Sequence, residues 1–97
     1  MAVTIILEVR AQKGTGSDFL STMKEILPDT RKADGCLSVD VYQNQDDSDV
    51  VVLVENFETK EHYEKYLAWR VERGDVEKLT AALEGEPSIR YFDQRDV

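Results

Sequence analysis

The stretch CLSVDVYQNQDDSDVVVLVENF (residues 36–57) decides the fold. Its first eight residues alternate between apolar and polar side chains, which predicts a half-buried strand. The apolar positions that share the inward face of this strand are Leu37, Val39 and Val41. The segment NQDDSD is polar and short, as a hairpin loop is. The next residues, VVVLVENF, are apolar on both faces through Val54, so this second strand needs cover on both sides of a sheet.

The segments before the hairpin predict a strand followed by a helix. VTIILEV (3–9) is rich in β-branched residues and has one strongly apolar face. In the loop KGTGS, Ser17 or Gly16 is placed to cap a helix, whose apolar residues then recur at helical spacing until about residue 31. Pro28 lies inside that pattern and predicts a kink or a short break.

The segments after the hairpin repeat the same order. Thr59 is placed to cap a second helix, which is expected to run to about Arg73 and to end at Gly74. Asp75 is placed to cap a further short helix. The segment SIRYFDQ (88–94) predicts the last strand.

The order β-α-β, β-α-β predicts one α+β domain over residues 1–97 with the ferredoxin-like arrangement. Right-handed crossovers lead to a four-stranded antiparallel sheet with both main helices on the same face. The opposite face then stays bare, although Ile6 and Val54 make it apolar. The simplest cover is a second copy packed sheet to sheet, so we expect a homodimer through this face.

Composition and charge narrow the range of partners. Twenty acidic residues against twelve basic ones give a net charge of -8, which repels phosphate backbones, so we expect no nucleic-acid partner. Cys36 is the only cysteine, which rules out an internal disulfide and a cysteine-based metal site. Glu8 and Arg10 interrupt the first apolar run too early for a leader, and no run approaches a membrane span. We therefore expect a cytoplasmic protein that does not bind membranes.

The helix predicted at 59–73 carries an arginine on its inward face. When residues are placed about 100° apart, Tyr66 and Arg70 lie at the centre of the arc opposite the charged side. A buried guanidinium without a partner is strongly destabilising. Two interpretations stay open: Arg70 extends to water near the helix end, where it favours the C-terminal dipole, or it lines a cavity between helix and sheet.

A cavity of this kind would suit a planar, oxygenated small molecule such as a phenol or a quinol. Tyr66 and Trp69 offer flat apolar walls, and Arg70 can hold an oxygen anion. Tyr63 and His62 lie on the two flanks of the arc and are further candidates for binding this molecule. Because His62 is the only histidine and no cysteine lies near it, we expect no metal site.

Three segments resemble the antibiotic biosynthesis monooxygenase domain family: RKADGCLSVDVYQ, VVLVENFETKEHYEKYLAW and EPSIRYF. The resemblance covers nearly the whole chain. It implies a dimeric α+β barrel built from ferredoxin-like subunits. Characterised members of the family include cofactor-independent oxygenases that act on anthrone- and quinol-type polyketides, and a branch that degrades haem.

The resemblance also implies roles for particular residues. In the oxygenases a phenolic substrate is bound between sheet and helices and is oxidised by O2 without metal or flavin. By similarity, Arg70 would stabilise the substrate oxyanion, Tyr66 would donate or relay a proton, and Trp69 would position the substrate. Asn56, at the end of the third strand, is a weaker candidate for the same task.

Two departures from the family pattern stand out. No histidine follows the segment LAWRVERG, where many members have one, and VEKLTAAL lacks the axial histidine that haem degradation needs. The leading hypothesis is therefore a cofactor-independent monooxygenase that oxidises a small aromatic metabolite with O2. The alternatives are a non-catalytic dimeric module that binds a small ligand or has a regulatory role, and an isomerase or lyase of the same barrel type.

Overall fold

The computed structural model describes residues 2–97. In chain order its elements are β1 (Val3–Arg10), α1 (Gly16–Arg31), β2 (Cys36–Gln43), β3 (Val50–Phe57), α2 (Lys60–Glu72), α3 (Asp75–Ala81) and β4 (Ser88–Phe92). The strands form one sheet in the order β2-β3-β1-β4, and all neighbouring strands are antiparallel. The predicted ferredoxin-like α+β fold with a four-stranded antiparallel sheet is confirmed.

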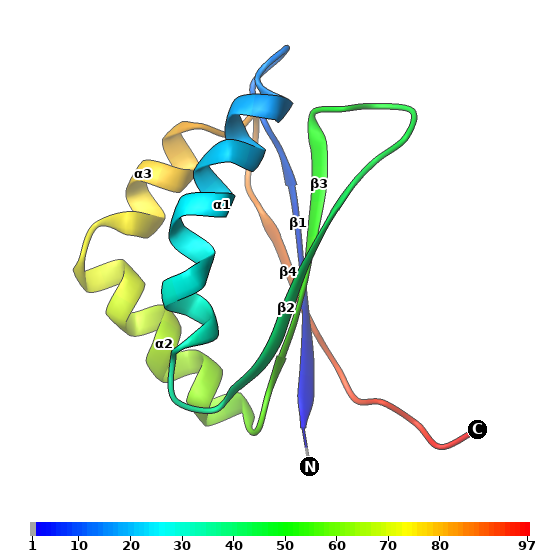
Figure 1. Ribbon diagram of the computed structural model, residues 1–97, viewed down its shortest axis with the longest axis vertical. Helices are drawn as coiled ribbons and strands as arrows, with labels where there is room; N and C mark the ends of the chain where they lie inside the picture. The colour runs from blue at the N-terminus through cyan, green and yellow to red at the C-terminus, as the bar shows by residue number, and fades with distance from the viewer. Residues whose placement is uncertain (1) are drawn as a thin grey trace.

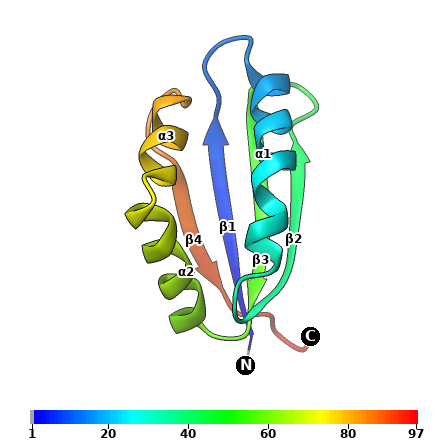
Figure 2. The ribbon, with the colours of Figure 1, turned by 60° about the vertical axis from the view of Figure 1, so that its left-hand side comes forward.

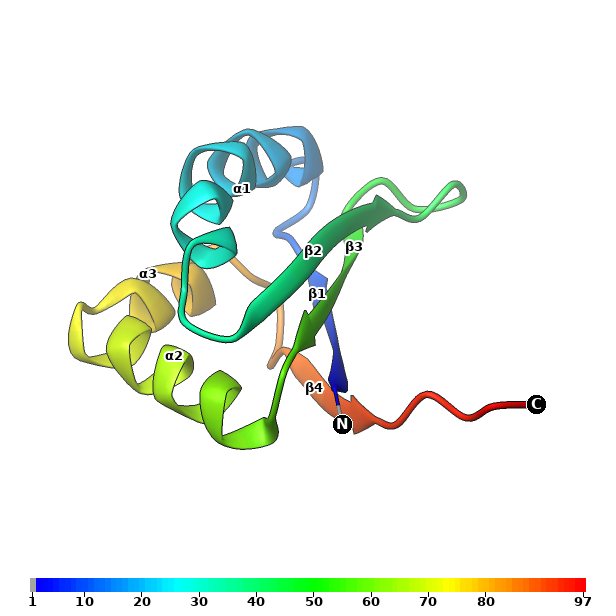
Figure 3. The same ribbon diagram turned by 60° about the horizontal axis from the view of Figure 1, so that its bottom comes forward.

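The molecule has two layers, one of helices and one of strands. All three helices lie on the same face of the sheet (Figure 1, Figure 3). The helix α1 runs along the half of the sheet that holds β2 and β3, while α2 and α3 follow one another along the half that holds β4 (Figure 2). No helix or strand of the described residues covers the opposite face of the sheet.

The core lies between the two layers and follows the alternation of the central strands. In β1 the odd-numbered residues Val3, Ile5 and Val9 are buried. In β3 the partners of Val3 and Val9 are Phe57 and Val51, and both are fully buried. Burial of one such side chain stabilises a fold by roughly 1.5–3 kcal/mol, so this strand pair supplies much of the hydrophobic stabilisation.

The prediction that Leu37 faces the core is wrong. A β-bulge lies between the pairs Cys36–Phe57 and Ser38–Asn56, so the strand holds one residue more than its partner at this point. Leu37 is consequently 56% exposed, and Cys36 packs against the core instead. Beyond the bulge the predicted alternation holds, because Val39 is buried.

The start of α1 is held by a side chain from another part of the chain. The helix begins at Gly16 with Thr15 at the N-cap position, and no side chain of this loop caps it, so the predicted cap at Ser17 or Gly16 is wrong. The carboxylate of Asp49, in the loop between β2 and β3, accepts hydrogen bonds from the backbone N–H groups of Gly14 at 2.9 Å and Gly16 at 3.0 Å. Asp49 therefore ties this helix to the hairpin.

The sequence signals inside α1 and at the two ends of α2 are followed in part. Pro28 does not break α1, which continues through it to Arg31. The helix α2 is capped as predicted by Thr59, whose Oγ1 accepts a hydrogen bond from the backbone N–H of His62 at 3.1 Å. Gly74 follows the last turn of α2 with a φ of 80°, a left-handed conformation that favours glycine, and so turns the chain into α3.

The close approach of α1 to the hairpin loop predicts that Gly16→Ala destabilises the fold. A Cβ at this position would lie 2.0 Å from the backbone oxygen of Ser48, so the loop would have to move. We expect the free energy of unfolding to fall by about 1–3 kcal/mol, measured by urea denaturation. Ser17→Ala, at the neighbouring exposed position, is the control and should change it by less than about 0.5 kcal/mol. A Gly16→Ala variant as stable as the wild type would contradict this packing.

Candidate functional site

A cavity of about 80 Å³ lies between the sheet and the helix layer. Its apolar walls come from all three helices and from the central strands; they include Leu53 of β3 and Leu67 of α2. The polar groups that line it are Glu55, Tyr63, Tyr66, Arg70 and Asp75. We call this space the interior cavity. A few polar groups that converge on an apolar pocket are typical of a small-molecule site.

Arg70 is buried and faces this cavity, with only 5% of its surface exposed. The interpretation in which it extends to water is therefore wrong. Its Nε donates to the Tyr66 hydroxyl at 3.0 Å, and its Nη1 donates to Asp75 Oδ2 at 2.8 Å. Its Nη2 donates to the Ile26 carbonyl at 3.0 Å and to Thr30 Oγ1 at 3.1 Å. Because a guanidinium has five N–H groups, one N–H on Nη1 remains for a ligand.

The environment of Arg70 keeps it charged. Burial disfavours the charged form, but the hydrogen bonds to Tyr66 and Asp75 outweigh this effect, so the pKa of Arg70 is raised above its usual value. Asp75 in turn pairs with Arg70 and, at 3.1 Å, with Arg73. The hydrogen bond from Arg70 lowers the pKa of Asp75 most, which keeps this carboxylate ionised. Asp75 is the first residue of α3, after Gly74 at the N-cap, so its predicted role as the cap is wrong.

Tyr66 stands between Arg70 and α1. Its hydroxyl lies 2.6 Å from the hydroxyl of Thr30, which is fully buried, and it accepts the hydrogen bond from Arg70. Burial raises the pKa of Tyr66, and burial likewise raises the pKa of Tyr63. Both phenols are therefore neutral near pH 7. When Thr30 acts as the donor, the Tyr66 proton is free to point toward the cavity.

Glu55 is a site residue that the sequence reasoning missed. It lies in the middle of β3 on the face that carries Leu53 and Phe57, and it is 3% exposed. Burial raises the pKa of Glu55 to about 7, although the charge of Arg70 opposes the shift. The signal was present in VVVLVENF, because alternation from Val51 places position 55 on the buried face.

The structure places Trp69 and His62 outside the interior cavity. Both line an open pocket of about 460 Å³ between the end of α1 and α2, which we call the outer pocket; Tyr66 lines both spaces. Trp69 is 39% exposed, and the guanidinium groups of Arg70 and Arg73 each lie 4.8 Å from the centroid of its ring. The His62 ring nitrogen Nδ1 lies 2.6 Å from Thr59 Oγ1.

Asn56 lies on the opposite face of the sheet from the interior cavity. Its side-chain nitrogen donates to Ser38 Oγ at 2.9 Å, and its oxygen accepts from Thr4 Oγ1 at 2.6 Å. These bonds join three neighbouring strands on the bare face. Of the candidates chosen from the sequence, the structure thus brings Arg70, Tyr66 and Tyr63 together, and it separates Asn56 from them.

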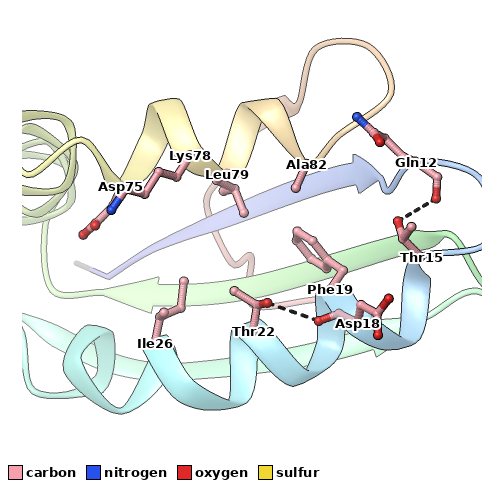
Figure 4. Close-up of a pocket in the computed structure, with 10 residues that line it drawn as sticks. All are labelled: Gln12, Thr15, Asp18, Phe19, Thr22, Ile26, Asp75, Lys78, Leu79 and Ala82. Carbon is pink, nitrogen blue, oxygen red and sulfur yellow. Dashed lines mark hydrogen bonds between the residues drawn. The ribbon is translucent and has the colours of Figure 1, made fainter.

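A groove of about 280 Å³ lies beside the interior cavity, between α1 and α3 (Figure 4). Phe19, Thr22 and Ile26 of α1 face Leu79 and Ala82 of α3 across it. The groove shares Ile26, Leu79 and Asp75 with the interior cavity, so these three side chains form the wall between the two spaces. We call it the helix groove.

Two features are absent from residues 2–97. No helix of this range is long and apolar enough to cross a membrane. The same residues hold no group of three or more His, Cys, Asp or Glu side chains that could bind a metal ion.

The sequence matches a known family over most of its length. The family model described as "Antibiotic biosynthesis monooxygenase" matches residues 2–71. The chain therefore belongs to the antibiotic biosynthesis monooxygenase family, and the resemblance seen in the sequence is confirmed. No match to a curated protein sequence was found.

Solved structures share the fold at low sequence identity. A conserved protein from Methanosarcina mazei Go1 has a TM-score of 0.86 and 16% identity, with 98% of this chain and 94% of that chain covered. Rv0793 from Mycobacterium tuberculosis has a TM-score of 0.85 and 18% identity, with coverage of 100% and 98%. A variant of SnoaB, a cofactor-independent oxygenase from Streptomyces nogalater, has a TM-score of 0.84 and 14% identity, with coverage of 99% and 95%.

The burial of Glu55 predicts a pH-dependent difference in stability between the wild type and Glu55→Gln. With a folded-state pKa of about 7 against an unfolded value of 4.5, the wild type loses stability as pH rises between these values and loses no more above them. We expect the variant to gain on the order of 3 kcal/mol relative to the wild type from pH 4.5 to pH 8, measured by urea denaturation. The exposed Glu64→Gln is the control. A difference that does not change with pH would contradict the burial of an ionisable Glu55.

Proposed function

We propose that this protein is a cofactor-independent monooxygenase that oxidises a small phenolic aromatic, of the quinol or anthrone type, with O2 in the interior cavity. The observation that carries the proposal is Arg70, a buried cation that lines an apolar cavity and keeps one N–H group for a ligand. Membership of the family supports the class of reaction.

The chemistry that this site offers is stabilisation of a substrate anion. A phenolate gives up an electron to O2 far more readily than the neutral phenol does, so a site that favours the anion promotes the reaction. Four hydrogen bonds hold the Arg70 guanidinium in place, so the position of its positive charge is fixed before the substrate arrives. A preorganised charge in a site with little water stabilises a developing oxyanion more than it would in solution. Neutral Tyr66 acts as a hydrogen-bond donor to the same oxygen.

The sizes of the two spaces define how a substrate would lie. The interior cavity, at about 80 Å³, is smaller than the roughly 150 Å³ of an apolar cavity that binds benzene, so a ring also needs space beyond Ile26 and Leu79. Together with the helix groove of about 280 Å³, it reaches the lower end of the range for ligand pockets, roughly 300–1,000 Å³. We infer that the reacting ring enters the interior cavity past Ile26 and Leu79, while the remainder of the molecule lies in the helix groove.

A second candidate function is a ligand-binding or regulatory module without chemistry. The observation that favours it is that protein groups already use four of the five N–H groups of Arg70. In this case Arg70 mainly joins α2 to α1 and α3. A module of this kind would bind an aromatic ligand but would consume no O2 with it.

Oxygen consumption tests the proposed reaction. We would measure it with a panel of benzene-1,4-diol, naphthalene-1,4-diol and 1,8-dihydroxy-9-anthrone, and subtract the rate without protein. We expect turnover with one or more of them, and a loss of about 10²–10³-fold in kcat for Arg70→Ala, the range for removal of an oxyanion-stabilising group. Tyr66→Phe, which keeps the ring, should lower kcat as well.

Arg73→Ala is the matched control for Arg70→Ala. Arg73 contacts both Asp75 and Trp69, as Arg70 does, but it is exposed and does not line the interior cavity. Its removal should leave kcat within about twofold. No turnover with any member of the panel, or equal losses for the two variants, would count against the proposed function.

We also propose that the protein is a homodimer through the bare face of the sheet. Ile6, Val52 and Val54 lie half-buried on this face, and Tyr42 and Phe92 are exposed on its outer strands. These side chains form an apolar patch with polar neighbours such as Asp40 and Asn56, and an exposed apolar patch with a polar surround is the usual mark of an interface. The interior cavity lies on the other side of the sheet, so a partner on this face would not cover it.

The dimer can be tested with one charge placed at the centre of this face. Ile6→Lys should convert the dimer to a monomer, because the cross-strand neighbours of Ile6 are Val54 and Arg90, and a buried lysine without an acidic partner is strongly unfavourable. The measurement is molar mass by light scattering coupled to size exclusion. Val71→Lys, on an exposed apolar position of α2, is the control and should stay dimeric. A wild type of monomer mass would contradict the proposal.

A further inference from the structure

Glu55 has no structural partner that accounts for its position. It is the only acidic residue among the side chains that β3 buries, and its neighbours across the sheet are Ile5 and Val39. Within residues 2–97 its side chain forms no ion pair and no hydrogen bond with another group. An apolar side chain of similar volume would stabilise this site better. Packing therefore does not explain a carboxyl group here.

The interior cavity is the place that the carboxyl group faces. Glu55 is one of the residues that line it, together with Arg70 and Tyr66. Arg70 is near enough for its charge to act on Glu55, but its hydrogen bonds go to Tyr66, Thr30, Ile26 and Asp75. A carboxyl group without a protein partner, aimed into a cavity beside a fixed positive charge, is placed to act on whatever enters.

Several other titratable groups lie around Glu55 and this cavity. These groups are Tyr63, Tyr66 and Arg70 of α2, Asp75 of α3, Cys36 of β2 and Tyr91 of β4. Among those that line the cavity, the two tyrosines are neutral and Arg70 is charged. The pKa of Asp75 is lowered by its hydrogen bond from Arg70, which makes it a weak base. The side chains of α1 that line the cavity are all apolar.

We propose that Glu55 is the general base of the reaction in the interior cavity, where its carboxylate takes the hydroxyl proton of the bound substrate. This proposal rests on the proposed monooxygenase function and adds the group that generates the substrate anion. Arg70 then stabilises the anion that Glu55 creates. The two residues act on the same oxygen without pairing with each other.

The proton and electron balance can be followed for an anthrone in its enol form. Glu55 takes the enol proton, and the resulting anion gives one electron to O2. The radical and the superoxide combine at the ring carbon to form a peroxide anion, which takes the proton back from Glu55. Glu55, ionised again, removes the remaining C–H proton as hydroxide leaves. One oxygen atom becomes the new carbonyl, and the other leaves as water with the two substrate hydrogens.

The pKa of Glu55 is suited to general-base catalysis near neutral pH. Burial raises it to about 7, so that at neutral pH the carboxyl group is divided between its ionised and protonated forms. A general base is most effective when its pKa lies near the working pH, because it must both take the proton and return it.

The test compares Glu55→Gln with the wild type in the oxygen-consumption assay, with 1,8-dihydroxy-9-anthrone as the probe, from pH 6 to pH 9. We expect kcat/KM of the wild type to rise with pH to a plateau above about 7. The variant should lose about 10²–10⁴-fold at pH 7. Its residual rate should approach the wild-type rate at high pH, where the probe ionises by itself. Glu64→Gln, an exposed glutamate on α2, should keep the wild-type profile.

Binding of an unreactive product analogue separates a lost base from a lost site. Titration calorimetry with 1,8-dihydroxyanthraquinone should give a Kd for Glu55→Gln within about threefold of the wild type, and a weaker Kd for Arg70→Ala, since Arg70 lines the interior cavity. If Glu55→Gln fails to bind, Glu55 only shapes the site and the base assignment is wrong.

The outcomes distinguish this proposal from the proposed function. A wild type that turns over the probe, with Glu55→Gln equally active, overturns the general base alone. A wild type without turnover overturns the proposed function, and the base with it. Infrared spectroscopy adds a readout that needs no substrate: the C=O band of a protonated carboxylic acid should vanish as pH rises through about 7 and be missing in Glu55→Gln. A Glu55 that is already ionised at pH 5 overturns the proposal.

Discussion

The buried guanidinium of Arg70 is the constraint on which the rest of the helix layer depends. A charge in this position has to be satisfied, and it is satisfied by groups from three helices: the Ile26 carbonyl and Thr30 hydroxyl of α1, the Tyr66 hydroxyl of α2 and the Asp75 carboxylate of α3. Movement of any one helix away from the others would leave part of a buried charge without a partner, which is strongly unfavourable. Arg70 thus holds the helices in a fixed arrangement above the sheet, and the interior cavity lies beneath it.

Glu55 lines the same cavity from the sheet side, and its carboxyl group interacts there with the charge of Arg70. Burial favours its protonated form, while the positive charge of Arg70 favours the ionised form. The balance of these two effects places the carboxyl group in the range where it can exchange a proton at neutral pH. A direct ion pair with Arg70 would have kept Glu55 ionised and occupied both groups. Asp75, and not Glu55, forms the ion pair with Arg70, so the Glu55 carboxyl group stays available to a ligand.

The sequence predicted the fold well because its strongest signals are local. Apolar alternation located the strands, and the Thr59 cap and Gly74 marked the ends of α2. Leu37 was misplaced because a bulge shifts the alternation by one residue, and no residue type in CLSVDVYQ marks that bulge. The start of α1 was misjudged because Asp49, distant in sequence, supplies the acceptors for its first N–H groups.

The candidate site was predicted only in part, for reasons that differ from residue to residue. Helical spacing placed Arg70 and Tyr66 together, but the direction of a long guanidinium side chain depends on Asp75 and Thr30, which periodicity does not bring near it. Strand alternation alone would have placed Glu55 inside and Asn56 on the other face. The measurement that tests the account most directly is a crystal structure with 1,8-dihydroxyanthraquinone bound. The account predicts a ring in the interior cavity with an oxygen on Arg70 Nη1 and Glu55 within hydrogen-bond distance. A molecule that lies only in the outer pocket, against Trp69 and His62, would contradict it.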